Sequence, residues 1–217
     1  MSGNTNSKIK KLSVLAMMSA FAWLAMFFLK FPVVSFLKYE PKDIFIVLSG
    51  FLYGPLAAGA VALVTALLEL PVSSTGVIGM VMNFLSSASF ACIASFIYQR
   101  KKSLLGAILG LLSGMAFMTV AMLLWNYLIT PLYMHIPRTE IVPMLTAVFL
   151  PFNLLKSGIN AAVTMLLYRP FVQILQQAGM APKTNEKEEK KSHLILAFLS
   201  CCVILGVCIW IVIRLNA

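Results

Sequence analysis

Residues 146–168, TAVFLPFNLLKSGINAAVTMLLY, form an apolar run long enough to cross a lipid bilayer, and a lysine lies near its centre. A hydrocarbon core about 30 Å thick requires about 20 predominantly apolar residues of helix. A lysine in the middle of such a helix costs roughly 2.5–3.5 kcal/mol on an insertion scale, so it usually faces a cavity or a partner. Lys156 therefore marks a candidate functional position within the membrane.

The composition of the whole chain is that of a polytopic membrane protein. Of its 217 residues, 60% are hydrophobic, and the mean hydropathy is +0.92, far above the range of soluble domains. We predict an all-α polytopic membrane fold, with a six-helix membrane domain over residues 1–177, a charged linker over 178–193 and an additional transmembrane helix over 194–214. The predicted spans are 12–29, 55–70, 77–98, 104–130, 146–168 and 194–213. The apolar run at 44–53 is too short to cross alone and is interpreted as a broken or re-entrant helix that makes one inward pass.

Basic residues are distributed unequally between the two sides of these spans. The net charge is +10, and the basic clusters precede the first span, separate 77–98 from 104–130, and follow 146–168. By the positive-inside rule, the N-terminus is cytoplasmic and the turn-rich loops 31–43 and 131–145 face outward. No clear cleavage site follows the first apolar run, so we expect it to remain as a transmembrane helix of the cell membrane. The positive charge thus indicates orientation, and no nucleic-acid partner is expected.

The apolar run at 146–168 carries a polar stripe. Asn153, Lys156, Ser157, Asn160 and Thr164 occupy positions i, i+3, i+4, i+7 and i+11, so they share one face of a helix. Pro151, just before the stripe, has no N–H and leaves the carbonyl of Ala147 without its helical donor.

Two other spans carry amides that could meet this stripe. Asn126 lies beside Trp125 and Tyr127, and Asn83 is followed one turn later by Ser86 and Ser87. If these faces converge, the outer half of the bundle holds a pocket suited to a flat, neutral molecule that forms hydrogen bonds. The alternative, which stays open above all for Asn83, is that the polar groups only bond between helices.

A charge partner for Lys156 must come from across the bundle. No carboxylate lies near it in sequence, and Asp43 and Glu69 are the candidates. A lysine buried without a partner would cost stability, so its removal is not expected to destabilise the ligand-free protein.

Catalytic and metal-binding motifs are absent from the sequence. The two histidines, His135 and His193, fall in a predicted loop and in the linker, and no HExxH, GxSxG or Walker sequence occurs. The four cysteines lie in apolar runs without metal-ligand spacing. We therefore predict no enzyme activity, no catalytic residues and no metal, and active transport would need a partner or an ion gradient.

Several short motifs suggest a family. They are FLKFPV (28–33), YEPKD (39–43), LYGP (52–55), MNF within TGVIGMVMNF (75–84), WNY (125–127), PLY (131–133) and PFNLLK (151–156). In this order they resemble the S components of energy-coupling factor (ECF) vitamin transporters, and among these the riboflavin-specific type. The resemblance covers about residues 8–176 and implies a six-helix S-component bundle that binds riboflavin, as transported ligand rather than cofactor, in its outer half.

The resemblance also implies the roles of particular residues and partners. Asn126, Asn153 and Lys156 would hydrogen-bond the flavin, and we expect Asn83 and Tyr39 to belong to the same site. The AxxxA spacing of Ala16 and Ala20, by itself only a packing signal, would contact a transmembrane T subunit. Two ATP-binding cassette ATPases of the energy-coupling module would drive release into the cell.

The region after residue 177 has no counterpart in the family pattern. The alternatives for the whole chain are an S component for another vitamin, a standalone proton-coupled permease and a membrane assembly factor without a ligand. A permease would be expected to show internal repeats and a titratable carboxylate at mid-membrane, and neither is evident.

Overall fold

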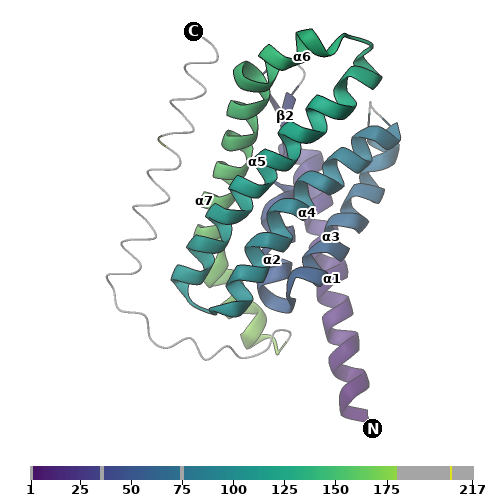
Figure 1. Ribbon diagram of the computed structural model, residues 1–217. Coiled ribbons are helices and arrows are strands. Elements are labelled where there is room, and N and C mark those ends of the chain that lie inside the picture. Colours follow the sequence, from purple (N-terminus) through teal and green to yellow (C-terminus); the bar gives the residue numbers. More distant parts are fainter. Residues whose placement is uncertain (1, 35–36, 74–75, 180–205, 207–217) are drawn as a thin grey trace.

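The computed structural model describes residues 2–34, 37–73, 76–179 and 206, and these residues form a helical bundle with one small hairpin (Figure 1). The prediction of an all-α polytopic membrane fold is confirmed. The helices are α1 (Ser2–Leu29), α2 (Lys42–Tyr53), α3 (Pro55–Glu69), α4 (Gly76–Arg100), α5 (Leu104–Met134), α6 (Arg138–Met144) and α7 (Leu150–Gln177). A 3₁₀ turn (Leu70–Val72) follows α3, a π-helical turn (Leu145–Phe149) joins α6 to α7, and the hairpin strands are β1 (Phe31–Val34) and β2 (Leu37–Tyr39).

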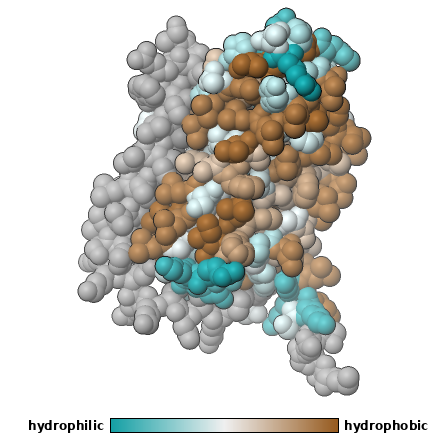
Figure 2. All heavy atoms as spheres, in the orientation of Figure 1, coloured by the Kyte–Doolittle hydropathy of each residue, from teal (hydrophilic) through white to brown (hydrophobic). Residues whose placement is uncertain are grey.

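Five helical stretches of the described residues are long and apolar enough to span a bilayer. They are Ser7–Leu29, Pro55–Val72, Gly76–Arg100, Leu104–Met134 and Arg138–Gln177. Each contains a span predicted from the sequence. Figure 2 shows a largely hydrophobic surface between hydrophilic residues that gather toward the two ends of the bundle. The last predicted span, 194–213, lies outside the described residues except for Gly206, and so do all but the first two residues of the predicted linker.

The apolar run at 44–53 forms a short core helix. Nine of the 12 residues of α2 are buried, and α2 packs against α1, α3, α4 and α7. A helix that is apolar on nearly all sides is stable only when other helices surround it. Gly54, with φ of 95°, ends α2 and allows Pro55 to begin α3 at once.

Both predicted outer loops contain more regular structure than expected. Residues 31–34 and 37–39 pair as an antiparallel hairpin, with Phe31 opposite Tyr39 and their ring centroids 5.1 Å apart. Strands this short show no alternating pattern in the sequence. Each is a strand because it pairs with the other, and its composition alone does not predict this. At the second loop, α5 continues through Pro131 and ends where His135 adopts φ of 55°, and α6 begins at Arg138. The predicted loop 131–145 is therefore wrong in extent, and only residues 135–137 remain non-helical.

The turn before α7 has a physical cause that the sequence already contained. Pro151 cannot donate to the carbonyl of Ala147, and the preceding residues form a π turn in which the N–H of Leu150 reaches the carbonyl of Leu145. The widened turn leads directly into the polar face of α7.

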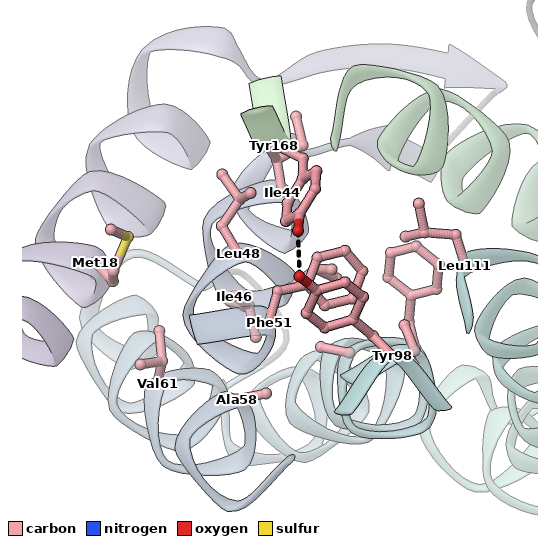
Figure 3. Close-up of a cluster of buried hydrophobic side chains, with 14 of the residues drawn as sticks. Met18, Ile44, Ile46, Leu48, Phe51, Ala58, Val61, Tyr98, Leu111 and Tyr168 are labelled. Atoms are coloured by element: carbon pink, nitrogen blue, oxygen red, sulfur yellow. Dashed lines mark hydrogen bonds between the residues drawn. The ribbon is translucent and has the colours of Figure 1, made fainter. Parts of the chain in front are cut away.

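The end of the bundle near Tyr53, Arg100 and Arg169 is tightly packed. Figure 3 shows the hydroxyl groups of Tyr98 in α4 and Tyr168 in α7 hydrogen-bonded to each other beside Phe51 of α2. The Phe51 ring stacks on Tyr98 with centroids 4.3 Å apart. These aromatic contacts join three helices at the end where α2 terminates.

Helices α4 and α5 approach closely at two glycines. A Cβ atom at Gly110 would lie 2.5 Å from the carbonyl oxygen of Ala94, and one at Gly114 would lie 2.6 Å from that of Phe90. Both distances are shorter than van der Waals contact with backbone that cannot move aside. The GxxxG spacing therefore sets the separation of the two helices.

We predict that Gly114→Val destabilises the protein by roughly 1–3 kcal/mol, because the added side chain must separate α4 from α5. Thermal unfolding of the protein in detergent measures the effect. Ala116→Val is the matched control, since Ala116 is exposed on the same helix. Equal midpoints for the two variants would contradict the close packing at Gly114.

Candidate ligand-binding site

A cavity of about 380 Å³ is lined by residues of the hairpin, the end of α5 and the start of α7, among others. Its volume is in the range of small-molecule sites. The polar lining residues are Lys30, Lys38, Glu40, Glu69, Ser73, Asn83, Ser86, Asn126, Tyr133, Asn153 and Lys156. The apolar lining residues are Leu37, Val72, Met82, Met122, Met134, Phe149 and Phe152. The cavity thus combines apolar walls with amide and charged groups drawn from several elements.

The structure brings together four of the five binding residues predicted from the sequence. Asn83 from α4, Asn126 from α5, and Asn153 and Lys156 from α7 all line the cavity. Tyr39 is not among the lining residues; its buried hydroxyl donates to Oδ1 of Asn160 at 2.8 Å. The predicted convergence of three helices is therefore present, with Tyr39 linking β2 to α7.

The aromatic lining differs from the expectation. Trp125 and Tyr127 flank Asn126 in sequence but do not line the cavity. The ring of Tyr127 is 37% exposed and lies 5.7 Å from the guanidinium of Arg138. Neighbours of a helical residue in sequence point about 100° away from it, so the rings that line the cavity come from other turns.

Local hydrogen bonds hold two of the three cavity amides. Nδ2 of Asn126 donates to the carbonyl of Met122 at 2.7 Å, and its Oδ1 accepts from the hydroxyl of Thr130 at 3.0 Å. Nδ2 of Asn153 donates to the carbonyl of Phe149, one turn back, at 2.7 Å. Each amide has two donors and two acceptor positions, so these bonds orient the side chain and leave capacity for a ligand.

Lys156 has a charge partner across the bundle, and it is Asp43. Its Nζ lies 3.9 Å from Oδ2 of Asp43 and 3.4 Å from Oγ of Ser86. The lysine is only 5% exposed, and Asp43 is fully buried. The other candidate, Glu69, pairs with Lys42 at 2.5 Å. The ion pair revises the expectation for Lys156, because removing the ammonium now leaves a buried carboxylate without its counter-ion.

A second group of charges forms a chain along the cavity wall. Glu40 pairs with Lys30 at 2.6 Å and with Lys42 at 2.8 Å. Lys42 in turn pairs with Glu69, which accepts a hydrogen bond from Nδ2 of Asn83 at 2.7 Å. This chain connects the end of α1, the end of the hairpin, α2, α3 and α4.

Glu40 and Lys42 were not predicted from the sequence to belong to the site. A signal was present, since only four carboxylate side chains precede residue 180, and three of them, Glu40, Asp43 and Glu69, are buried at or beside the cavity. In so apolar a chain a carboxylate has few places where it is stable, and burial among lysines is one of them.

The ionisation of Glu40 follows from its neighbours. Burial alone would raise the pKa of this carboxyl, but the ammonium groups of Lys42, Lys156 and Lys30 outweigh burial and lower the pKa from 4.5 to about 2. The carboxylate is therefore charged at neutral pH. Its contribution to stability is complete above the ordinary pKa of 4.5 and is lost as the pH falls toward 2.

Comparison with known proteins gives consistent results over most of the chain. Residues 10–168 match the family model described as "ECF transporter, substrate-specific component". The riboflavin transporter FmnP of Bacillus subtilis (strain 168) is 33% identical over 182 residues, covering 76% of this chain and 95% of that protein. The riboflavin transporter RibU of Staphylococcus aureus (strain TCH60) is 33% identical over 177 residues, covering 77% and 93%.

A solved structure also resembles this chain. It is described as "Structure and mechanism of the S component of a bacterial ECF transporter", with a TM-score of 0.66 and 33% sequence identity. The match covers 78% of this chain and 99% of that chain.

We predict that Lys42→Met destabilises the protein by roughly 3–5 kcal/mol, because Lys42 is the shared partner of two buried carboxylates. We expect Lys30→Met to destabilise it less. The side chain of Lys30 is 30% exposed, so water replaces part of its interaction with Glu40. Unfolding midpoints of the two variants in the same detergent test the difference. A larger fall in the unfolding midpoint for Lys30→Met than for Lys42→Met would show that the interior charges are not organised around Lys42.

Proposed function

The chain belongs to the substrate-specific components of ECF transporters, and we propose that it is the riboflavin-binding subunit of an ATP-driven vitamin uptake system. One observation carries the proposal: Asn83, Asn126, Asn153 and Lys156 converge on a single cavity in a chain 33% identical to two riboflavin transporters. The role is to bind and deliver a vitamin, and no catalytic residue or cofactor enters it.

The chemistry of the cavity suits a flavin. The isoalloxazine ring is flat and neutral and has carbonyl and N–H groups along one edge, and the ribityl chain carries hydroxyl groups. The amides of Asn126 and Asn153 can pair with both donors and acceptors, and Lys156 donates to an oxygen. A hydrogen bond from a charged group contributes about 1.5–3 kcal/mol. The side chains of Met82, Met122 and Phe152 supply apolar contact for the ring faces.

Asn83 and Tyr39 have supporting roles in this proposal. Asn83 lines the cavity and donates to Glu69, which joins it to the chain of charges. Tyr39 acts behind the wall through Asn160 and connects the hairpin to α7. The hairpin contributes Leu37 and Lys38 to the lining, so the segment after α1 covers the bound flavin.

The orientation of the bundle supports uptake from outside. Lys8, Lys10 and Lys11 in α1 and the basic residues 100–102 between α4 and α5 lie at the end opposite the cavity. The positive-inside rule places that end, with the N-terminus, in the cytoplasm of the cell. The cavity then lies toward the outer surface, where the vitamin arrives.

ATP-driven release into the cell requires partners, because no ATP-binding motif occurs in the sequence. The partners are a transmembrane T subunit and two ATP-binding cassette ATPases of the energy-coupling module. Ala16 and Ala20 are exposed one turn apart on α1. Two small exposed side chains at this spacing let a partner helix approach closely, and we assign the T subunit to this face.

We expect the full-length protein, purified from cells supplied with riboflavin, to be yellow and to show the flavin absorption bands. Flavin-free protein should quench riboflavin fluorescence on titration with one site per chain. Asn153→Leu and Lys156→Met should weaken binding by about ten- to a hundredfold. Thr164→Val is the control on the same face of α7, since Thr164 is buried and does not line the cavity. A colourless protein that takes up no flavin would refute the riboflavin assignment.

Replacing Ala16 and Ala20 with tryptophan should prevent assembly with the energy-coupling module and leave riboflavin affinity unchanged, because neither residue lines the cavity. Co-purification with the T subunit and the ATPases measures assembly. Val120→Trp is the control, because Val120 is 67% exposed on α5, away from the α1 face. Normal assembly of the double tryptophan variant would place the T subunit elsewhere.

A further inference from the structure

Asp43 is a fully buried charge that does not line the cavity. It is the only aspartate of the chain and lies in the first turn of α2. Its side chain has no exposed area. An ionised carboxylate in such a position is costly unless it is paired and hydrogen-bonded. The groups that contact Asp43 therefore indicate its role beside the cavity.

Both carboxylate oxygens of Asp43 accept hydrogen bonds from neutral side chains. Oδ1 accepts from the hydroxyl of Ser87 in α4 at 2.5 Å, and Oδ2 accepts from Nδ2 of Asn160 in α7 at 3.0 Å. Asn160 is held in turn by the hydroxyl of Tyr39 at 2.8 Å. The carboxylate is thus fixed between three helices by groups that carry no charge.

Lys156 lies close enough to Asp43 for strong attraction but too far for a hydrogen bond. The distance from Nζ to Oδ2 is 3.9 Å, whereas N–H···O hydrogen bonds span about 2.7–3.2 Å. An ammonium has three N–H donors. Among the described residues Nζ makes one hydrogen bond, to Oγ of Ser86, and at 3.4 Å that bond is long. Donors of a lysine that lines the cavity therefore remain for a ligand.

We propose that Asp43 is a positioning residue of the flavin site, which offsets the charge of Lys156 while hydrogen bonds from Ser87 and Asn160 hold its carboxylate beyond hydrogen-bond distance of the lysine. A contact ion pair would spend those donors on the protein, and the ligand would have to displace the carboxylate. An ammonium without a counter-ion would be costly to keep buried among the helices. The observed arrangement avoids both outcomes. The inference rests on the proposed function, since it concerns how the cavity binds a flavin.

The isosteric variant Asp43→Asn removes the charge and can keep both hydrogen bonds. Its amide oxygen can accept from Asn160, and its NH₂ group can donate to Ser87, whose hydroxyl both donates and accepts. We expect riboflavin affinity of the full-length variant to fall about tenfold, in the range of couplings between neighbouring groups. Glu140→Gln is the matched control for the loss of one negative charge, because Glu140 is exposed and does not line the cavity; its affinity should be unchanged.

A double-mutant cycle with Lys156→Met separates positioning from a general effect on the fold. If Asp43 acts through Lys156, Asp43→Asn should change affinity less than about twofold in the Lys156→Met background. Each single variant leaves one buried charge without the partner nearest to it, so the double variant should unfold at a higher temperature than either. An equal loss of affinity in both backgrounds, or no loss in the wild-type background, overturns the inference.

Ser87→Ala provides a second test that does not require Asp43→Asn to fold. It removes one of the two hydrogen bonds that hold the carboxylate of Asp43, which can then move into hydrogen-bond distance of Lys156, so affinity should fall about threefold and only when Lys156 is present. An unchanged affinity overturns the idea that Ser87 holds Asp43 away from the lysine donors. Absence of riboflavin binding by the wild-type protein refutes the proposed function itself, whereas wild-type binding without the coupling refutes only this inference.

Discussion

A charged side chain among membrane-spanning helices must find a compensating charge inside the protein, and this constraint organises the cavity end of the bundle. Lys156 comes from α7, the last described helix, and its counter-ion Asp43 comes from α2, more than a hundred positions earlier. The pair can form only when these helices lie side by side. Pairing therefore couples the assembly of the bundle to the formation of the cavity, because the same ammonium lines the cavity.

The chain from Lys30 through Glu40 and Lys42 to Glu69 applies the same constraint to the segment above the cavity. A two-stranded hairpin has little stability of its own, and β1 and β2 are only four and three residues long. Glu40 follows β2 directly and is held by lysines on both sides. Tyr39 adds a buried hydrogen bond to α7. The hairpin is thus joined to the helices by polar contacts at its second strand.

The opposite end of the bundle is built differently, from close packing. Gly110 and Gly114 bring α5 against the backbone of α4, and the rings of Phe51, Tyr98 and Tyr168 fill the space between α2, α4 and α7. Packing of this kind leaves no room for a ligand and holds the helices at defined separations. A rigid end and a polar, hollow end suit a subunit that binds a small molecule at one side of the membrane.

The sequence by itself determined the membrane class and five of the spans, and it predicted four of the polar residues that line the cavity. It could do so because transfer into lipid depends on composition over about 20 residues, and because the 3.6-residue period places Asn153 and Lys156 on one face. Pro151 likewise indicated a missing helical hydrogen bond before the stripe, where the structure has a π-helical turn. Such features depend on neighbours along the chain.

Only the tertiary structure decided which charges pair, which rings line the cavity, and that residues 31–34 and 37–39 form strands. From the sequence, Asp43 and Glu69 were equal candidates for the charge partner of Lys156. In the structure Lys156 pairs with Asp43, and Glu69 pairs with Lys42. Trp125 and Tyr127 adjoin Asn126 in sequence, yet Phe149 and Phe152 line the cavity. The physical reason is that Coulomb attraction, hydrogen bonding and van der Waals contact act over a few ångströms. Which groups come within that distance depends on how separate helices pack, and the periodicity along one helix does not specify that packing.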